Sequence, residues 1–141
     1  MAYQLRQESL PLLPSGTGQI RILHFSDLHL TPSRKREIAD IKSWAALKPD
    51  LVISTGDFLA HRDGVEVALN ALNELLAIPG LYVFGSNDYY GPRFKNPLSY
   101  LKSDDGERRL GEKLPIEQFD SELKRRGWIN LNNSEKHYRN Q

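Results

Sequence analysis

The stretch from residue 19 to residue 88 contains three short apolar runs, each followed at once by polar side chains: QIRILHF then SDLH at 19–29, LVIS then TGD at 51–57, and LYVF then GSND at 81–88. The apolar runs are rich in β-branched and aromatic residues, and each predicts a buried strand. Apolar residues at helical spacing fill the two intervals between them. The alternation of strand, helix, strand, helix and strand is typical of a parallel sheet, so the chain is predicted to be an α/β protein.

Capping residues and prolines set the predicted limits of the helices. Thr31-Pro32-Ser33 is a helix start, and Pro49 ends the first apolar stripe. Asp63-Gly64 opens the second helix, which Pro79-Gly80 closes. Beyond a loop at 89–115, a third helix is predicted at 116–126, and a further strand is predicted at 128–131.

The 141 residues are interpreted as three segments. Residues 1–18, with two prolines and two glycines, form an extended amino-terminal arm. Residues 19–131 form the folded domain, and residues 132–141 form a polar tail. The basic runs at 34–36 and 124–126 are interpreted as solvated helix faces.

Composition excludes several classes of function. A net charge of +1 gives no signal for nucleic acid or an anionic membrane as a partner. The absence of cysteine excludes disulfides, thiolate zinc sites and cysteine nucleophiles, so any metal must be held by oxygen and nitrogen. Neither a membrane-spanning stretch nor the apolar core of a signal peptide is visible, and a cytoplasmic location is expected.

The polar residues after the three strands have the chemistry of metal ligands. In parallel sheets such residues meet beyond the carboxyl ends of the strands. Asp27 and His29 are two residues apart, and in an extended chain they would point the same way and hold one ion together. Asp57 can bridge two ions with its two oxygens, and the amide oxygen of Asn87 can bind the second. We therefore expect a centre for two divalent ions, which such sites hold roughly 3.5 to 4 Å apart.

These motifs resemble those of the calcineurin-like metallophosphoesterase family. The family pattern is Asp-x-His, then Gly-Asp, then Gly-Asn-His followed by Asp or Glu, and then further histidines near the end of the domain. Ser26-Asp27-Leu28-His29 matches the first block and Gly56-Asp57 matches the second. The resemblance covers residues 19–131, which correspond to the amino-terminal half of a family domain.

The third block departs from the family pattern, because Gly85-Ser86-Asn87-Asp88 stands where the family has Gly-Asn-His-Asp. Counted from Gly80 along the strand, Asn87 falls at the ligand asparagine and Asp88 takes the place of the histidine. Counted back from Asp88 without a gap, Ser86 occupies the ligand place and Asn87 the histidine place. We favour the first alignment, because an amide oxygen is a better ligand than a neutral hydroxyl. Both alignments stay open, and both lack the histidine.

In the family this histidine helps the leaving group to depart, and Asp88 is the candidate for that catalytic role here. Nearby cations lower the pKa of a carboxyl group, so we expect either a slower reaction or a different proton donor. Tyr89 and Arg93 are candidates for binding substrate, by stacking and by holding its phosphate. The alternative for both is a loop anchored by aromatic side chains.

The resemblance implies a metallophosphoesterase-like α/β/β/α sandwich, of which this chain supplies the first βαβαβ half. The family's later histidines are missing, since His137 is the only histidine after residue 61 and lacks a Gly-His-x-His setting. We therefore interpret residues 19–131 as a partial, truncated domain. A carboxyl-terminal half or a partner chain is expected to complete its site.

The implied function is hydrolysis of a phosphate mono- or diester by a water that two divalent metal ions, such as Mn, Fe or Zn, activate. The alternative is a non-catalytic α/β fragment or binding module with an incomplete metal site. A Rossmann-type nucleotide-binding module is a weaker interpretation, since no Gly-x-Gly-x-x-Gly follows the first strand.

Overall fold

A computed structural model describes residues 2–91 and 111–133 of the chain. The elements in chain order are β1 (Ile22–Phe25), α1 (Lys35–Ser43), the 3-10 helix η1 (Trp44–Leu47), β2 (Leu51–Ser54), α2 (Gly64–Ala71), the 3-10 helix η2 (Leu75–Ala77), β3 (Gly80–Tyr82), α3 (Ser86–Tyr89), α4 (Ile116–Arg125) and β4 (Ile129–Asn130).

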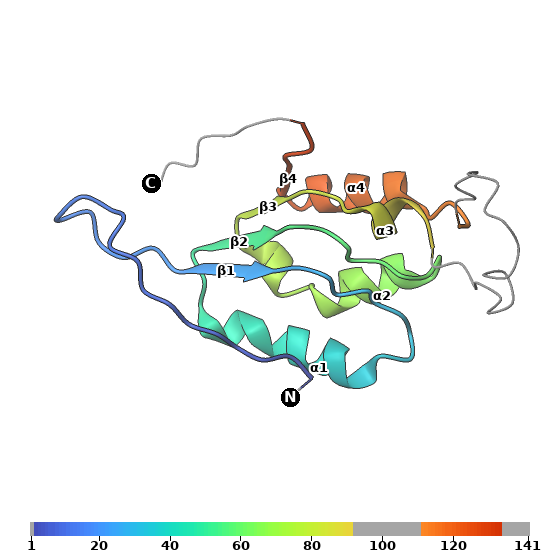
Figure 1. Ribbon diagram of the computed structural model, residues 1–141, viewed down its shortest axis with the longest axis horizontal. Coiled ribbons are helices and arrows are strands. Elements are labelled where there is room, and N and C mark those ends of the chain that lie inside the picture. The colour runs from blue at the N-terminus through green and yellow to red at the C-terminus, as the bar shows by residue number, and fades with distance from the viewer. Residues whose placement is uncertain (1, 92–110, 134–141) are drawn as a thin grey trace, which may run out of the picture.

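The strands form one parallel sheet in the order β1-β2-β3-β4. Phe25 pairs with Ser54, and Ser54 pairs with Tyr82, so β1, β2 and β3 end level with one another. Helices α1, α2 and α4 lie side by side on one face of this sheet (Figure 1). Each new strand is added on the same side of the previous one, so right-handed crossovers bring all three helices to the same face. The predicted α/β class with a parallel sheet is confirmed.

Several element limits differ from the sequence prediction. β1 starts at Ile22, opposite Leu51, where its partner β2 starts. The preceding residue, Arg21, makes two hydrogen bonds to Asp50. The backbone N–H of Asp50 donates to Arg21 O at 2.8 Å, and the backbone N–H of Arg21 donates to the Asp50 carboxylate at 2.7 Å. α1 begins at Lys35, after a turn in which Arg34 N–H donates to Thr31 O at 3.1 Å. The short helix α3 was not predicted, and it spans the third polar motif and the first residue of the predicted loop.

A cluster of aromatic side chains around Phe58 forms the centre of the core. Phe58 is fully buried, and its ring lies 5.2 to 6.5 Å, centroid to centroid, from four other rings, those of Phe25, Tyr82, Phe84 and Phe119. Phe25 lies in β1, Tyr82 lies in β3, Phe84 lies two residues after β3, and Phe119 lies in α4. Phe58 itself directly follows Asp57, so the core anchors the chain next to a predicted ligand.

The segments expected to be peripheral make specific contacts. At the start of the chain, the Tyr3 ring packs edge-on against Trp44 at 5.3 Å, and the backbone N–H groups of Ala2 and Tyr3 donate to the Asp40 carboxylate of α1. Asn132, in the predicted tail, accepts a hydrogen bond from Phe84 N–H at 2.9 Å. Among the helices of residues 2–91 and 111–133, none is long and apolar enough to span a membrane.

Phe58→Ala is expected to lower the free energy of unfolding by about 3 to 5 kcal/mol, because it opens a cavity where four rings meet. Ile22→Ala is the control, since Ile22 is a strand residue that is 52% exposed, and it should cost less than about 1 kcal/mol. Urea unfolding followed by circular dichroism measures both. Equal losses in the two variants would contradict a core centred on Phe58.

Candidate metal centre

The segments after β1 and β2 continue to pair beyond the ends of the strands. Asp27 N–H donates to Gly56 O at 3.0 Å, and His29 N–H donates to Asp57 O at 3.0 Å. Leu30 N–H then donates to Phe58 O at 2.8 Å. These bonds fix the first two predicted ligand motifs against each other at the carboxyl edge of the sheet.

The backbone at this edge has left-handed dihedral angles. Asp27, His29 and Asp57 have φ values of 56°, 43° and 57°. They are three of the five non-glycine residues with positive φ in the part of the chain that the structure describes. The extended conformation expected for Asp27 and His29 is therefore wrong. Left-handed non-glycine residues are uncommon, although aspartate and histidine adopt this conformation more often than most residues, and they are enriched at functional sites.

Asp27, His29 and Asp57 nevertheless converge. Each offers one ligand atom, and these atoms all lie within 4.8 Å of one another. His29 Nε2 is 3.7 Å from Asp27 Oδ1, and the two side chains are 33% and 66% exposed, so the cluster opens to solvent. Two carboxylates and an imidazole suit a divalent ion such as Mn, Fe or Zn, and this donor set fits the metal predicted from the sequence.

Asn87 contacts the cluster through Asp57. Its backbone N–H donates to Asp57 Oδ1 at 3.0 Å, and its side-chain Nδ2 donates to Asp57 Oδ2 at 2.8 Å. Turning the amide group by half a turn would present its oxygen at the same position. Asn87 thus lies beside the three ligands, while its role as a ligand stays a prediction.

Asp88 directly follows Asn87 in the chain and is fully buried. Its two oxygens accept hydrogen bonds from the backbone N–H groups of Asp57, Leu59 and Gly85, at 2.8, 2.9 and 3.0 Å. Burial raises the pKa of the Asp88 carboxyl group, the charge of Asp57 raises it further, and the three backbone hydrogen bonds oppose the rise. The catalytic role predicted for Asp88 stays a prediction.

The remaining candidates lie on or beyond α3. Ser86 is the first residue of this helix and is exposed. Tyr89 is its last residue, is 37% exposed, and accepts a hydrogen bond from Asn132 Nδ2 at 3.0 Å. Arg93 and His137 lie outside the described residues. Contact of Tyr89 or Arg93 with a substrate stays a prediction.

Arg34 is a residue that the sequence interpretation missed. Its Nη1 donates to the carbonyl oxygen of Leu28 at 3.0 Å, between the two ligands Asp27 and His29. The basic run at 34–36 was interpreted as a solvated helix face. The basic run begins five residues after His29, and this closeness was the sequence signal that Arg34 contacts the first ligand motif.

Two glycines allow the ligand segments to approach closely. A Cβ atom on Gly56, whose φ is 101°, would lie 2.5 Å from Gly85 N. A Cβ atom on Gly85 would lie 2.0 Å from Asp57 Oδ1. Any side chain at either position would therefore push the second and third ligand segments apart.

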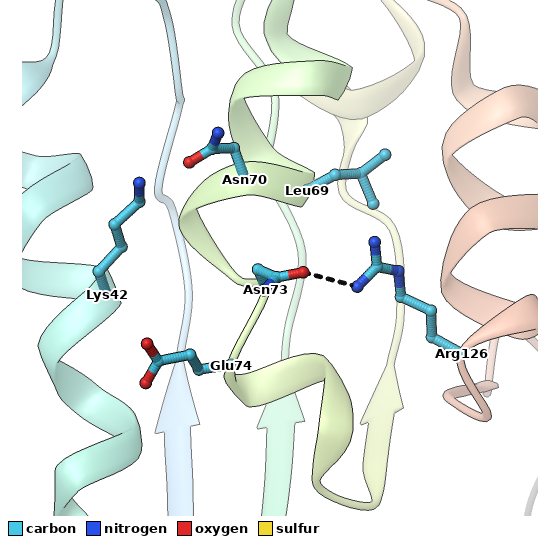
Figure 2. Close-up of a pocket in the computed structure, with 6 residues that line it drawn as sticks. All are labelled: Lys42, Leu69, Asn70, Asn73, Glu74 and Arg126. Carbon is cyan, nitrogen blue, oxygen red and sulfur yellow. Dashed lines mark hydrogen bonds between the residues drawn. The ribbon is translucent and has the colours of Figure 1, made fainter.

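A separate pocket lies between the carboxyl-terminal ends of α1, α2 and α4 (Figure 2). It is lined by Lys42, Leu69, Asn70, Asn73, Glu74 and Arg126. Crossover helices run antiparallel to the strands, so their carboxyl ends lie at the edge of the sheet opposite the ligand cluster. This pocket is not part of the metal centre.

Gly56→Ala should destabilise the chain more than Gly127→Ala. Both glycines have positive φ, but Gly127 has no atom within 4 Å of the added Cβ. Gly127→Ala should cost about 1 to 2 kcal/mol for its left-handed backbone alone. Gly56→Ala should cost about 2 to 4 kcal/mol, because a clash with Gly85 is added. Urea unfolding checks the difference, and equal costs would contradict the close packing of the two segments.

Residues 20–139 match the family model described as Calcineurin-like phosphoesterase, which covers most of the chain. No curated protein and no solved structure matches. The family match spans all three ligand motifs, and its first two motifs supply the residues that converge at the sheet edge. The chain therefore belongs to the calcineurin-like phosphoesterase family.

Proposed function

We propose that the chain hydrolyses a phosphate ester at a metal centre formed by Asp27, His29 and Asp57. The observation that carries this proposal is the convergence of their three ligand atoms within 4.8 Å. The cluster is open to solvent on the side of Asp27, which leaves access for a substrate. Membership of the phosphoesterase family supports the same class of reaction.

The proposed roles of the chain's residues follow from their contacts. Asp27, His29 and Asp57 would hold the first ion, and Asp57 and Asn87 would hold a second. When bound, such ions supply Lewis acidity toward the phosphoryl oxygens and activate a water. The backbone N–H of Asn87 fixes the orientation of the Asp57 carboxylate through its hydrogen bond to Oδ1, which both orientations of the amide side chain allow. Arg34 holds the backbone between Asp27 and His29.

We further propose that Tyr89 and Arg93 bind the substrate. Tyr89 offers an aromatic face and a hydroxyl group at the end of α3. Arg93 follows four residues later, and a guanidinium group matches the geometry of a phosphate.

The second candidate function is a metal-binding module without catalysis. It is favoured by the size of the cluster, since His29 is the only histidine in the three-residue group found among the described residues. A site with so few ligands can hold an ion without completing the centre that hydrolysis needs. Binding of Mn²⁺ without hydrolysis would distinguish this candidate from the enzyme.

His29→Ala should raise the dissociation constant for Mn²⁺ by at least about tenfold, because it removes one of three clustered ligands. His24→Ala is the matched control: His24 lies in β1, five residues before His29, and its Nε2 is 3.1 Å from Thr55 Oγ1. Its effect should stay within about twofold. Isothermal titration calorimetry measures both constants. A wild-type chain that binds no Mn²⁺ would sink the proposed centre.

Hydrolysis of para-nitrophenyl phosphate and of its bis-ester tests the activity. The chain loaded with Mn²⁺ should release nitrophenolate, and removal of the metal with EDTA should abolish the release. Asp57→Asn should lower kcat/KM by about 100-fold or more, because it removes a charge from the centre. Asp63→Asn is the control, since Asp63 pairs with His61 outside the cluster, and it should keep full activity. Hydrolysis that survives EDTA would contradict the mechanism.

A further inference from the structure

Asp88 has an environment that the proposed reaction does not explain. A carboxylate that is fully buried needs hydrogen-bond donors for its oxygens. Here the donors are all backbone N–H groups, with Oδ2 accepting from Asp57 and Gly85 and Oδ1 accepting from Leu59. Asp88 is 0% exposed, so neither oxygen reaches the solvent.

These three donors come from the two segments that carry the ligands. Asp57 and Leu59 belong to the turn after β2, and Gly85 directly precedes α3. The side chain of Asp88 therefore joins the second ligand segment to the third. Asn87 adds the complementary contacts from α3 to the Asp57 carboxylate.

The turn around Asp57 needs such a support. Gly56 and Asp57 are consecutive left-handed residues, with φ of 101° and 57°, and this conformation costs an aspartate more than it costs a glycine. Hydrogen bonds from N–H groups to a charged carboxylate are among the stronger ones in proteins. Asp88 binds the N–H of Asp57 itself, so it fixes the residue whose carboxylate belongs to the cluster.

We propose that Asp88 is a positioning residue that holds the Asp57 carboxylate in its ligand orientation through the backbone of residues 57–59, in place of donating a proton to the leaving group. This inference rests on the proposed function, in which Asp57 is a metal ligand. In this role the Asp88 side chain acts on the metal centre through the backbone N–H groups of Asp57 and Leu59, and it does not touch the substrate.

Asp88→Asn tests the proposal, because the side chain keeps its shape while one oxygen acceptor becomes a donor. Titration of the 141-residue chain with Mn²⁺ alone should show a dissociation constant raised by about 10- to 100-fold. Asp120→Asn is the matched control: the Asp120 carboxylate on α4 accepts hydrogen bonds from Tyr82 Oη at 2.7 Å and Asn130 Nδ2 at 2.6 Å, outside the cluster. Its Mn²⁺ constant should stay within about twofold of wild type. An unchanged constant in Asp88→Asn would overturn the proposal.

A second readout needs no metal. In the metal-free chain, amide exchange followed by NMR should speed up at Asp57, Leu59 and Gly85 by at least about tenfold in Asp88→Asn. The amide of Val52, which donates to Pro79 O at 2.9 Å in the sheet, should keep its wild-type rate. If the wild-type chain bound no Mn²⁺, the proposed function would fail, and this exchange pattern would still decide whether Asp88 holds the turn. Unchanged exchange at Asp57 and Leu59 would overturn the inference.

If Asp88→Asn did not fold, Asp88→Glu would take its place. Glutamate keeps both acceptor oxygens but moves them by one methylene group. The Asp88→Glu chain should have the circular dichroism spectrum of a folded protein. Its dissociation constant for Mn²⁺ should rise above the wild-type value, by less than the rise expected for Asp88→Asn. A folded Asp88→Glu chain with wild-type Mn²⁺ affinity and wild-type exchange would equally overturn the proposal.

Discussion

The convergence of Asp27, His29 and Asp57 depends on the parallel register of β1, β2 and β3. Phe25, Ser54 and Tyr82 lie in one row across the sheet. The three strands therefore end level, and the residues that follow each strand lie at the same edge of the sheet. The pairing then continues past the strands, as far as a bridge between Leu30 and Leu59. A slip of one residue would turn Phe25 and Tyr82 out of the core, so burial fixes the register. The hydrophobic core thereby sets the positions of the ligands.

The sequence was sufficient to place the strands approximately and to predict that Asp27, His29 and Asp57 converge, because both depend on local patterns. Leu51–Ser54 is an apolar run of strand length, and β2 has these limits. Asp27, His29 and Asp57 follow such runs directly, and parallel strands bring the following residues together. Their backbone angles could not be predicted in this way. Aspartate and histidine tolerate positive φ more often than most residues, but pairing with the neighbouring segment decides whether they adopt it.

Other features depend on contacts between distant segments, which a single sequence does not display. Arg34 resembles any other basic residue at a helix start until the carbonyl of Leu28 is seen within its reach. Helix α3 is short and has no apolar stripe, because its residues serve contacts to the turn after β2. Tyr3 is far from Trp44 in sequence, and its packing against that ring could not be predicted from an arm rich in proline and glycine.

The third motif is the one for which the sequence left two alignments open. In one alignment Asn87 is an amide ligand, and in the other it occupies the place of the family's histidine. Its two hydrogen bonds to the Asp57 carboxylate bring it to the cluster in either case. Asp88, by contrast, would have to face the substrate if it replaced the histidine. Its oxygens instead bind backbone N–H groups on both ligand segments. On the proposed positioning role, the chain keeps the support of the metal centre in Asp88, and the group that assists the leaving group must come from elsewhere.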